Sequence, residues 1–178
     1  NLYIARLSDP WTVQGPRVKI SEPQFEWEMQ CVGRDGNNVA YPIYVNESPC
    51  TIENPDHSRI LLFYSASFNI TPYRCIGMLS MDTSDDPMDP SSWVKCPEPV
   101  FRMSESSGIY SVGCPCFVPS PDGEELFLCY QAANSAKNTG RGNRDFRIQK
   151  VCWNPDGTLN LGIPVADGVP QNKPSGTL

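Results

Sequence analysis

The stretch Leu61-Leu62-Phe63-Tyr64-Ser65-Ala66-Ser67 decides the fold class, and a similar stretch recurs as Leu126-Phe127-Leu128-Cys129-Tyr130-Gln131-Ala132. Short runs rich in aromatic and aliphatic side chains, bounded by Pro, Gly, Asn or Asp, are typical of β-strands. Helical periodicity is nearly absent, and the 18 prolines and 13 glycines of the chain separate runs of strand length. We therefore predict an all-β chain, with its clearest strands at residues 2–6, 60–65, 75–80, 125–130 and 147–153.

A long internal repeat predicts the architecture. Ile4, Ile76 and Ile148 occupy similar predicted strands and follow one another at intervals of 72 residues. Repeats of this length that hold several short strands are typical of β-propeller blades. The alternative is a two-layer β-sandwich whose strands share this spacing by coincidence.

The repeat also predicts how the chain is divided. An inner-type strand precedes the second and third copies, at residues 61–67 and 126–132, whereas the first copy would need residues before Asn1. We expect the C-terminal part of one propeller domain, with the end of a blade at 1–30, a blade at 31–100, and the last blade or blades and the closure at 101–178. Because blades expose apolar faces to their neighbours, we expect packing against an N-terminal portion of the same propeller, attached in a precursor or present as a separate chain.

Composition narrows the classes of partner. The 178 residues are 39% apolar and carry a net charge of −6, with a sequence pI near 4.7. A surface this acidic repels phosphate backbones, which argues against nucleic acid. No apolar run reaches the roughly 18 residues of a membrane span. Neutral ligands such as sugars suit this charge.

Cysteines and glycosylation motifs predict an extracellular protein. The chain has eight cysteines but one histidine, His57, and lacks the paired ligand spacing of zinc sites. We expect disulfides whose pairing is open, with Cys75 and Cys129 as alternative buried free thiols. Asn46-Glu47-Ser48 and Asn69-Ile70-Thr71 are acceptor motifs for N-glycans, and we expect Asn69 to carry one. A glycan at Asn46 would stand next to Glu47.

A series of motifs in a fixed order resembles glycoside hydrolase family 43, and within it the α-L-arabinofuranosidases. The resemblance covers nearly the whole chain. It rests on these segments in order: Val45–Pro49, Phe63–Ser67, Ile76–Leu79, Asp89–Trp93, Pro97–Phe101, Tyr110–Cys114, Cys129–Ala132, Arg147–Gln149 and Trp153–Gly157.

The resemblance implies a fold and a reaction. The fold is a five-bladed β-propeller, of which this chain would cover roughly the last three blades. The reaction is the exo-acting, inverting hydrolysis of arabinofuranosides in plant arabinan or arabinoxylan. It uses an Asp general base, an orienting Asp and a Glu general acid. Glu47 matches the general acid, whereas the two Asp residues have no positions here, so we expect the chain alone to be inactive.

Further residues follow from the same resemblance. Ser65, Ser67, Arg147 and Tyr110 are implied to contact the sugar. Cys114 stands where the family has a His that helps hold a central water or calcium ion, so we expect no metal ligand there. No cofactor is expected to be required, and calcium binding is left open. The loss of this His also supports an alternative function, a degenerate propeller that binds polysaccharide without hydrolysing it.

Overall fold

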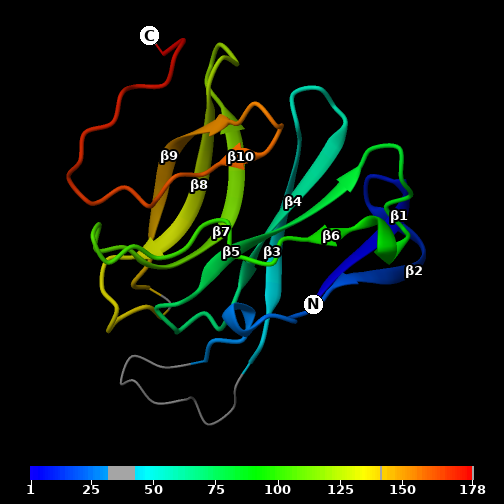
Figure 1. The fold of residues 1–178 in the computed structure, drawn as a ribbon, viewed down its shortest axis with the longest axis horizontal. Helices are drawn as coiled ribbons and strands as arrows, with labels where there is room; N and C mark the ends of the chain where they lie inside the picture. Colours follow the sequence, from blue (N-terminus) through cyan, green and yellow to red (C-terminus); the bar gives the residue numbers. More distant parts are fainter. Residues whose placement is uncertain (32–42, 141, 178) are drawn as a thin grey trace.

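The computed structural model describes residues 1–31, 43–140 and 142–177, and in this part the chain is built from β-strands and two short 3-10 helices (Figure 1). The strands form a two-stranded hairpin and two four-stranded antiparallel sheets, with the orders β1-β2, β3-β4-β5-β6 and β7-β8-β9-β10. In chain order the elements are β1 (Leu2–Asp9), β2 (Thr12–Ser21), η1 (Glu26–Glu28), β3 (Asn46–Glu53), β4 (Arg59–Ala66), β5 (Cys75–Asp82), η2 (Pro90–Ser92), β6 (Val94–Lys95), β7 (Tyr110–Pro119), β8 (Leu126–Ala133), β9 (Asp145–Trp153) and β10 (Leu159–Asn160).

The 72-residue repeat corresponds to equivalent strands. Ile76 lies in β5 and Ile148 in β9, and each of these is the third strand of its sheet. Ile4 lies in β1, which pairs with the strand that follows it, as β5 pairs with β6 and β9 with β10. Successive meandering sheets of this kind are propeller blades rather than the two layers of a sandwich.

The apolar run of β4 is continuous because the first four-stranded sheet is covered on both faces. Leu61 and Phe63 pack into a core shared with the second sheet. Leu62 and Tyr64 alternate with them and pack into a second core, which the hairpin β1-β2 shares. Side chains alternate across a strand, so both faces of β4 must be apolar when both are buried.

The order of strands in the first sheet corrects one expectation. Residues 61–67 are expected to form an inner-type strand, but β4 is the second strand of its sheet and Glu47 lies in the first strand, β3. The alternation of β3 is interrupted by a bulge between Glu47 and Cys50, where Ser48 adopts a φ of 53° and Pro49 follows. A bulge of this kind adds an extra residue to the strand and interrupts the alternation of side chains, so the strand is not recognised from the sequence.

The structure does not support the expected disulfides, because all eight cysteines are free thiols. Cys75 and Cys129 are buried within strands and pack as small apolar side chains, which was the alternative prediction. Burial raises the pKa of the Cys75 thiol to about 12, and its Sγ lies 3.8 Å from the Trp27 carbonyl oxygen.

Candidate functional site

Glu47 stands at the start of β3 and forms an ion pair with a buried arginine. Arg74 Nη2 donates a hydrogen bond of 2.8 Å to Glu47 Oε1. The arginine side chain is only 2% exposed, whereas that of Glu47 is 42% exposed, so the carboxylate opens to solvent above a buried positive charge. Charge-assisted hydrogen bonds are stronger than neutral ones, and this one orients the carboxylate of Glu47.

The second sheet completes the surroundings of Arg74. Arg74 Nη2 also lies 3.6 Å from Cys114 Sγ, and Ser48 Oγ lies 3.6 Å from the same sulfur. Gly113 makes room for the guanidinium, since a Cβ at this position would lie 2.2 Å from Arg74 Nη1. Although burial raises the pKa of the Cys114 thiol, hydrogen bonds from Arg74 and Ser48 lower it more, so the pKa lies below its usual value.

Several polar atoms of this cluster have no hydrogen-bond partner among the described residues. Arg74 Nε and Nη1 and Ser111 Oγ are all buried and unpaired. Native proteins satisfy most buried polar groups, so unpaired donors beside an exposed carboxylate indicate a place where a ligand or another part of a protein binds. Arg74 and the two residues that it contacts, Glu47 and Cys114, are hereafter called the Glu47 cluster; Ser111 lies nearby in the chain, three residues before Cys114.

Two predicted sugar contacts lie close to this cluster but are buried. Ser65 is the cross-strand partner of Glu47, and its Oγ accepts a 2.7 Å hydrogen bond from the Cys114 backbone N–H. Ser67 Oγ donates to the Trp27 carbonyl oxygen and accepts from the Gln30 backbone N–H. Both hydroxyls are therefore engaged by the backbone, and their contact with sugar stays a prediction.

The other two predicted contacts lie in the second sheet. Arg147 is mostly buried, and its Nη2 donates a 2.6 Å hydrogen bond to Asp167 Oδ1. This contact holds the pKa of Asp167 below its usual value. Arg147 Nε is buried without a partner in the described chain, so this guanidinium retains one free donor. Tyr110 is half-buried at the start of β7.

The two glycosylation motifs differ in accessibility. Asn46 is 2% exposed, and its side-chain amide donates a 2.9 Å hydrogen bond to Glu28 Oε1. Asn69 is half-buried in the connection between β4 and β5. The Asn46 amide is thus engaged in the folded chain, and glycosylation of Asn69 stays a prediction.

Sequence reasoning missed a buried acid, Glu28 in η1. Its carboxylate accepts hydrogen bonds from Lys95 Nζ at 2.9 Å, from the Tyr64 hydroxyl at 2.9 Å, and from the Asn46 amide. Burial raises its pKa, but these bonds and the backbone N–H groups of Phe25 and Gln24 outweigh burial and lower it. Glu28 joins η1 to β3, β4 and β6, and so positions the start of β3.

Arg74 was also missed, although one signal marks it. It directly precedes the apolar strand Cys75–Leu79, where a charged residue must either reach solvent or find a buried partner. Only the pairing of β3 with β4 and of β4 with β5, which brings the start of β3 near the start of β5, shows that the partner is Glu47.

The cluster does not fit a calcium ion. Calcium takes six to eight oxygen ligands, whereas the Cys114 thiol lies here next to a positive guanidinium. Across residues 1–31, 43–140 and 142–177, no three His, Cys, Asp or Glu side chains gather closely enough to hold a metal ion. His57 does not contribute a metal ligand to this cluster, since it is exposed in the β3–β4 turn and its Nδ1 lies 2.7 Å from Glu53 Oε2.

Two blades and a hairpin, with an acid at the start of the first strand of a blade, define part of a β-propeller. The chain belongs to the glycosyl hydrolases family 43, whose model matches residues 1–159. It is 41% identical over 173 residues to an extracellular exo-alpha-(1->5)-L-arabinofuranosidase of Streptomyces avermitilis, and 37% identical over 172 residues to alpha-L-arabinofuranosidase 43 of Humicola insolens. These matches cover 95% and 94% of this chain.

Solved structures agree with the family. The crystal structure of alpha-L-arabinofuranosidase from Lactobacillus brevis superimposes with a TM-score of 0.83 at 31% identity, over 96% of this chain and 49% of that one. A thermostable family-43 glycoside hydrolase superimposes with a TM-score of 0.77 at 25% identity, over 98% of this chain and 50% of that one. The chain spans about a third of the length of the two curated relatives, at 33% of each.

Proposed function

We propose that this chain is part of an exo-acting, inverting α-L-arabinofuranosidase that acts on plant arabinan or arabinoxylan, with Glu47 as the general acid. The observation that supports this most is the Glu47 cluster. It presents a carboxyl group to solvent, anchors it on a buried guanidinium, and leaves further donors unpaired beside it. The names of the relatives suggest the sugar and the exo mode.

The geometry suggests how Glu47 would act. Arg74 engages Oε1 of the carboxyl group. The second oxygen, Oε2, would then carry the proton toward the glycosidic oxygen of the leaving group. A general acid needs this fixed orientation, because proton transfer requires the two heavy atoms to lie at about hydrogen-bond distance.

Inversion needs a second carboxylate about 6.5–9.5 Å from the first, with a water between them. The family resemblance places the base on an Asp that precedes the region matched by this chain. We propose that this Asp is supplied by another part of the same protein, and that residues 1–178 alone do not hydrolyse glycosides. The unpaired N–H groups of Arg74 would be donors for groups that this part brings.

The exposed flanks support such a partner. Ile76 is fully buried, whereas the equivalent Ile148 is 40% exposed, and Phe146, two residues earlier in β9, is 72% exposed. On the hairpin, Leu7 and Val13 are exposed as well. Large exposed apolar side chains on the hairpin and on the last sheet indicate interaction surfaces, and we propose that further blades cover them.

We also propose that the protein is secreted. Two of its relatives, from Streptomyces avermitilis and Streptomyces chartreusis, are named extracellular. In the described part of the chain, no helix is long and apolar enough to cross a membrane. A plant cell-wall polysaccharide is a substrate that an enzyme meets outside the cell.

One observation favours a second candidate, a propeller that binds polysaccharide without hydrolysis. Cys114 Sγ lies 3.6 Å from Nη2 of Arg74, the partner of Glu47, and the family resemblance implies a histidine at the position of Cys114. If this substitution disables the site, the complete protein would still bind arabino-oligosaccharides but would not cleave them.

Replacing Glu47 with Gln in the longer polypeptide tests the assignment. We expect hydrolysis of an aryl arabinofuranoside to fall at least about 100-fold, as is typical for loss of a general acid. The matched control is Glu53→Gln, because Glu53 lies in the same strand but at its exposed far end. Equal activity of the two variants contradicts the role of Glu47. Binding without turnover in the unmodified protein favours the second candidate.

A further inference from the structure

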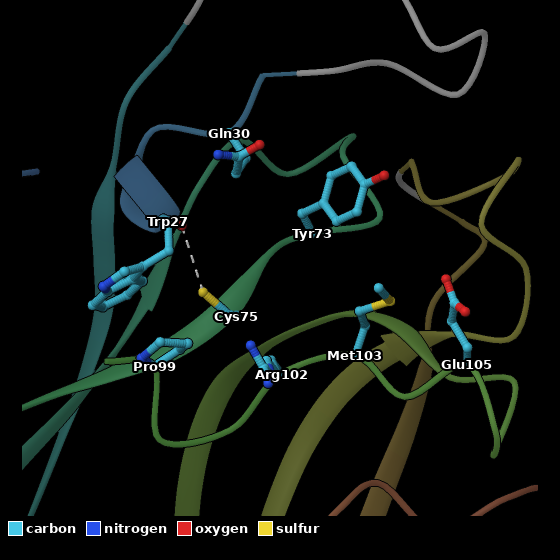
Figure 2. Close-up of a pocket in the computed structure, with 8 residues that line it drawn as sticks. All are labelled: Trp27, Gln30, Tyr73, Cys75, Pro99, Arg102, Met103 and Glu105. Carbon is cyan, nitrogen blue, oxygen red and sulfur yellow. Dashed lines mark hydrogen bonds between the residues drawn. The ribbon is translucent and has the colours of Figure 1, made fainter. Parts of the chain in front are cut away.

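A separate cavity opens beside the segment that carries Arg74. It has a volume of about 420 Å³, which lies within the range typical of small-ligand sites. Figure 2 shows its walls, which come from three segments: η1 and the residues after it, the start of β5, and the β6–β7 connection. The lining side chains are Trp27, Gln30, Tyr73, Cys75, Pro99, Arg102, Met103 and Glu105.

The apolar part of the wall suits the face of a sugar ring. Tyr73 is 45% exposed and lines the cavity, on the side across from Arg102 and Met103 in the view of Figure 2. Trp27 is fixed in place, because its indole N–H donates a 2.8 Å hydrogen bond to the Pro97 carbonyl oxygen. Aromatic side chains with an apolar body and a polar edge bind partners that are apolar on one face and polar at the rim.

The polar part of the wall is free to bind. The Tyr73 hydroxyl, the Arg102 guanidinium and the Glu105 carboxylate have no hydrogen bond or ion pair with any residue of the described chain. One positive and one negative group balance each other, so the cavity has no net charge to attract an ion. Unpaired donors and acceptors around a stacking surface match a neutral, hydroxyl-rich ligand.

The position of the cavity connects it with the Glu47 cluster. Arg74 extends from the β4–β5 connection to Glu47, whereas its neighbour Tyr73 extends into the cavity. Consecutive residues thus serve the two sites. We propose that this cavity is a binding subsite for a neutral sugar unit of the polysaccharide on which Glu47 acts, outside the unit that is cleaved. The identity of the polysaccharide rests on the proposed function above.

The test measures binding and hydrolysis separately in the longer polypeptide. In the Glu47→Gln background, we expect Tyr73→Ala to weaken the calorimetric affinity for arabinan about five- to tenfold, which is the usual effect of removing one aromatic anchor. The control is Trp11→Ala, because Trp11 is an aromatic residue that is 83% exposed at the hairpin tip, away from the cavity. We expect the control to change the affinity less than about twofold.

A second comparison uses the active protein. We expect Tyr73→Ala or Arg102→Ala to reduce kcat/KM for arabinan at least about fivefold more than kcat/KM for a short aryl arabinofuranoside, because the short substrate does not reach the cavity. Equal losses with both substrates, or equal effects of Tyr73→Ala and Trp11→Ala on arabinan affinity, would overturn the subsite. If the protein proves not to hydrolyse arabinosides but its arabinan affinity still depends on Tyr73, the subsite stands and the proposed hydrolase function falls.

Discussion

Gly113→Ala is a sharp test of the Glu47 cluster. The added Cβ would lie 2.2 Å from Arg74 Nη1 and 2.5 Å from its Cζ, well inside the 3.4 Å of ordinary contact. Gly113 has no positive φ, so the backbone accepts alanine and only the guanidinium opposes it. Arg74 is buried and cannot move without leaving Glu47 Oε1.

The cost has two parts. Overpacking a buried position costs about 1–3 kcal/mol. Losing a hydrogen bond to a charged group costs about 1.5–3 kcal/mol when it is buried, and less here because Glu47 is 42% exposed. We therefore expect Gly113→Ala to lower the free energy of unfolding by about 2–4 kcal/mol. In the longer polypeptide we expect the proposed glycosidase activity to fall as well, because Glu47 loses its anchor.

A double-mutant cycle measures whether the effect passes through Arg74. Chemical denaturation of the wild type, Gly113→Ala, Arg74→Ala and the double variant provides the four free energies of unfolding. In the Arg74→Ala background the clash is gone, so adding Gly113→Ala should change stability by less than about 0.5 kcal/mol. If Gly113→Ala costs the same in both backgrounds, the coupling between Gly113 and Arg74 does not exist and the reasoning is refuted.

The buried ion pair predicts a pH dependence of stability. The pKa of Glu28 is lowered in the folded chain, so its contribution is present above the unfolded value of about 4.5 and is lost as pH falls through the folded value. Glu28→Gln should cost about 3–5 kcal/mol near pH 7, because Lys95 is left buried without its partner. The loss should shrink at pH 3.5. The control is Glu98→Gln, because Glu98 is exposed and does not contact Lys95 in the described chain. A loss that is independent of pH contradicts this role. Thiol reactivity offers a further check: under native conditions Cys116 should react with an aromatic disulfide reagent, whereas Cys75 should react only after unfolding, since it is buried and its pKa is about 12. Rapid native labelling of Cys75, followed by peptide mapping, would contradict the packing of the second core.

The proposal that further blades cover both flanks follows from how burial differs along the repeat. Ile76 is buried because the first four-stranded sheet has neighbours on both faces, whereas Ile148 is exposed on the last sheet. The two positions have the same residue and an equivalent place in their sheets. Their exposure differs because a sheet packs against Ile76 and none of the described chain covers Ile148. Residue type alone therefore does not determine burial at this position of the repeat.

The sequence by itself determined the fold class and the family. Short apolar and aromatic runs, Pro- and Gly-rich turns and the 72-residue spacing are local or repeated signals, and each can be recognised without knowledge of the tertiary contacts. The assignment of Glu47 as the general acid likewise comes from a short motif that resembles the family's, and it stays a proposal. The strand that contains Glu47 was missed, because the bulge at Ser48 and Pro49 breaks the alternation.

Only the tertiary structure decided what surrounds Glu47. Arg74 is 27 residues away in the chain, and Gly113 and Cys114 belong to the next sheet. A pairing of this kind leaves no periodic signal, because it depends on the register between strands and on the packing of one sheet against another. The state of the cysteines also depends on tertiary structure. The even count of eight favoured disulfides, but two thiols can form a bond only where the fold brings their sulfur atoms together, and all eight cysteines are free.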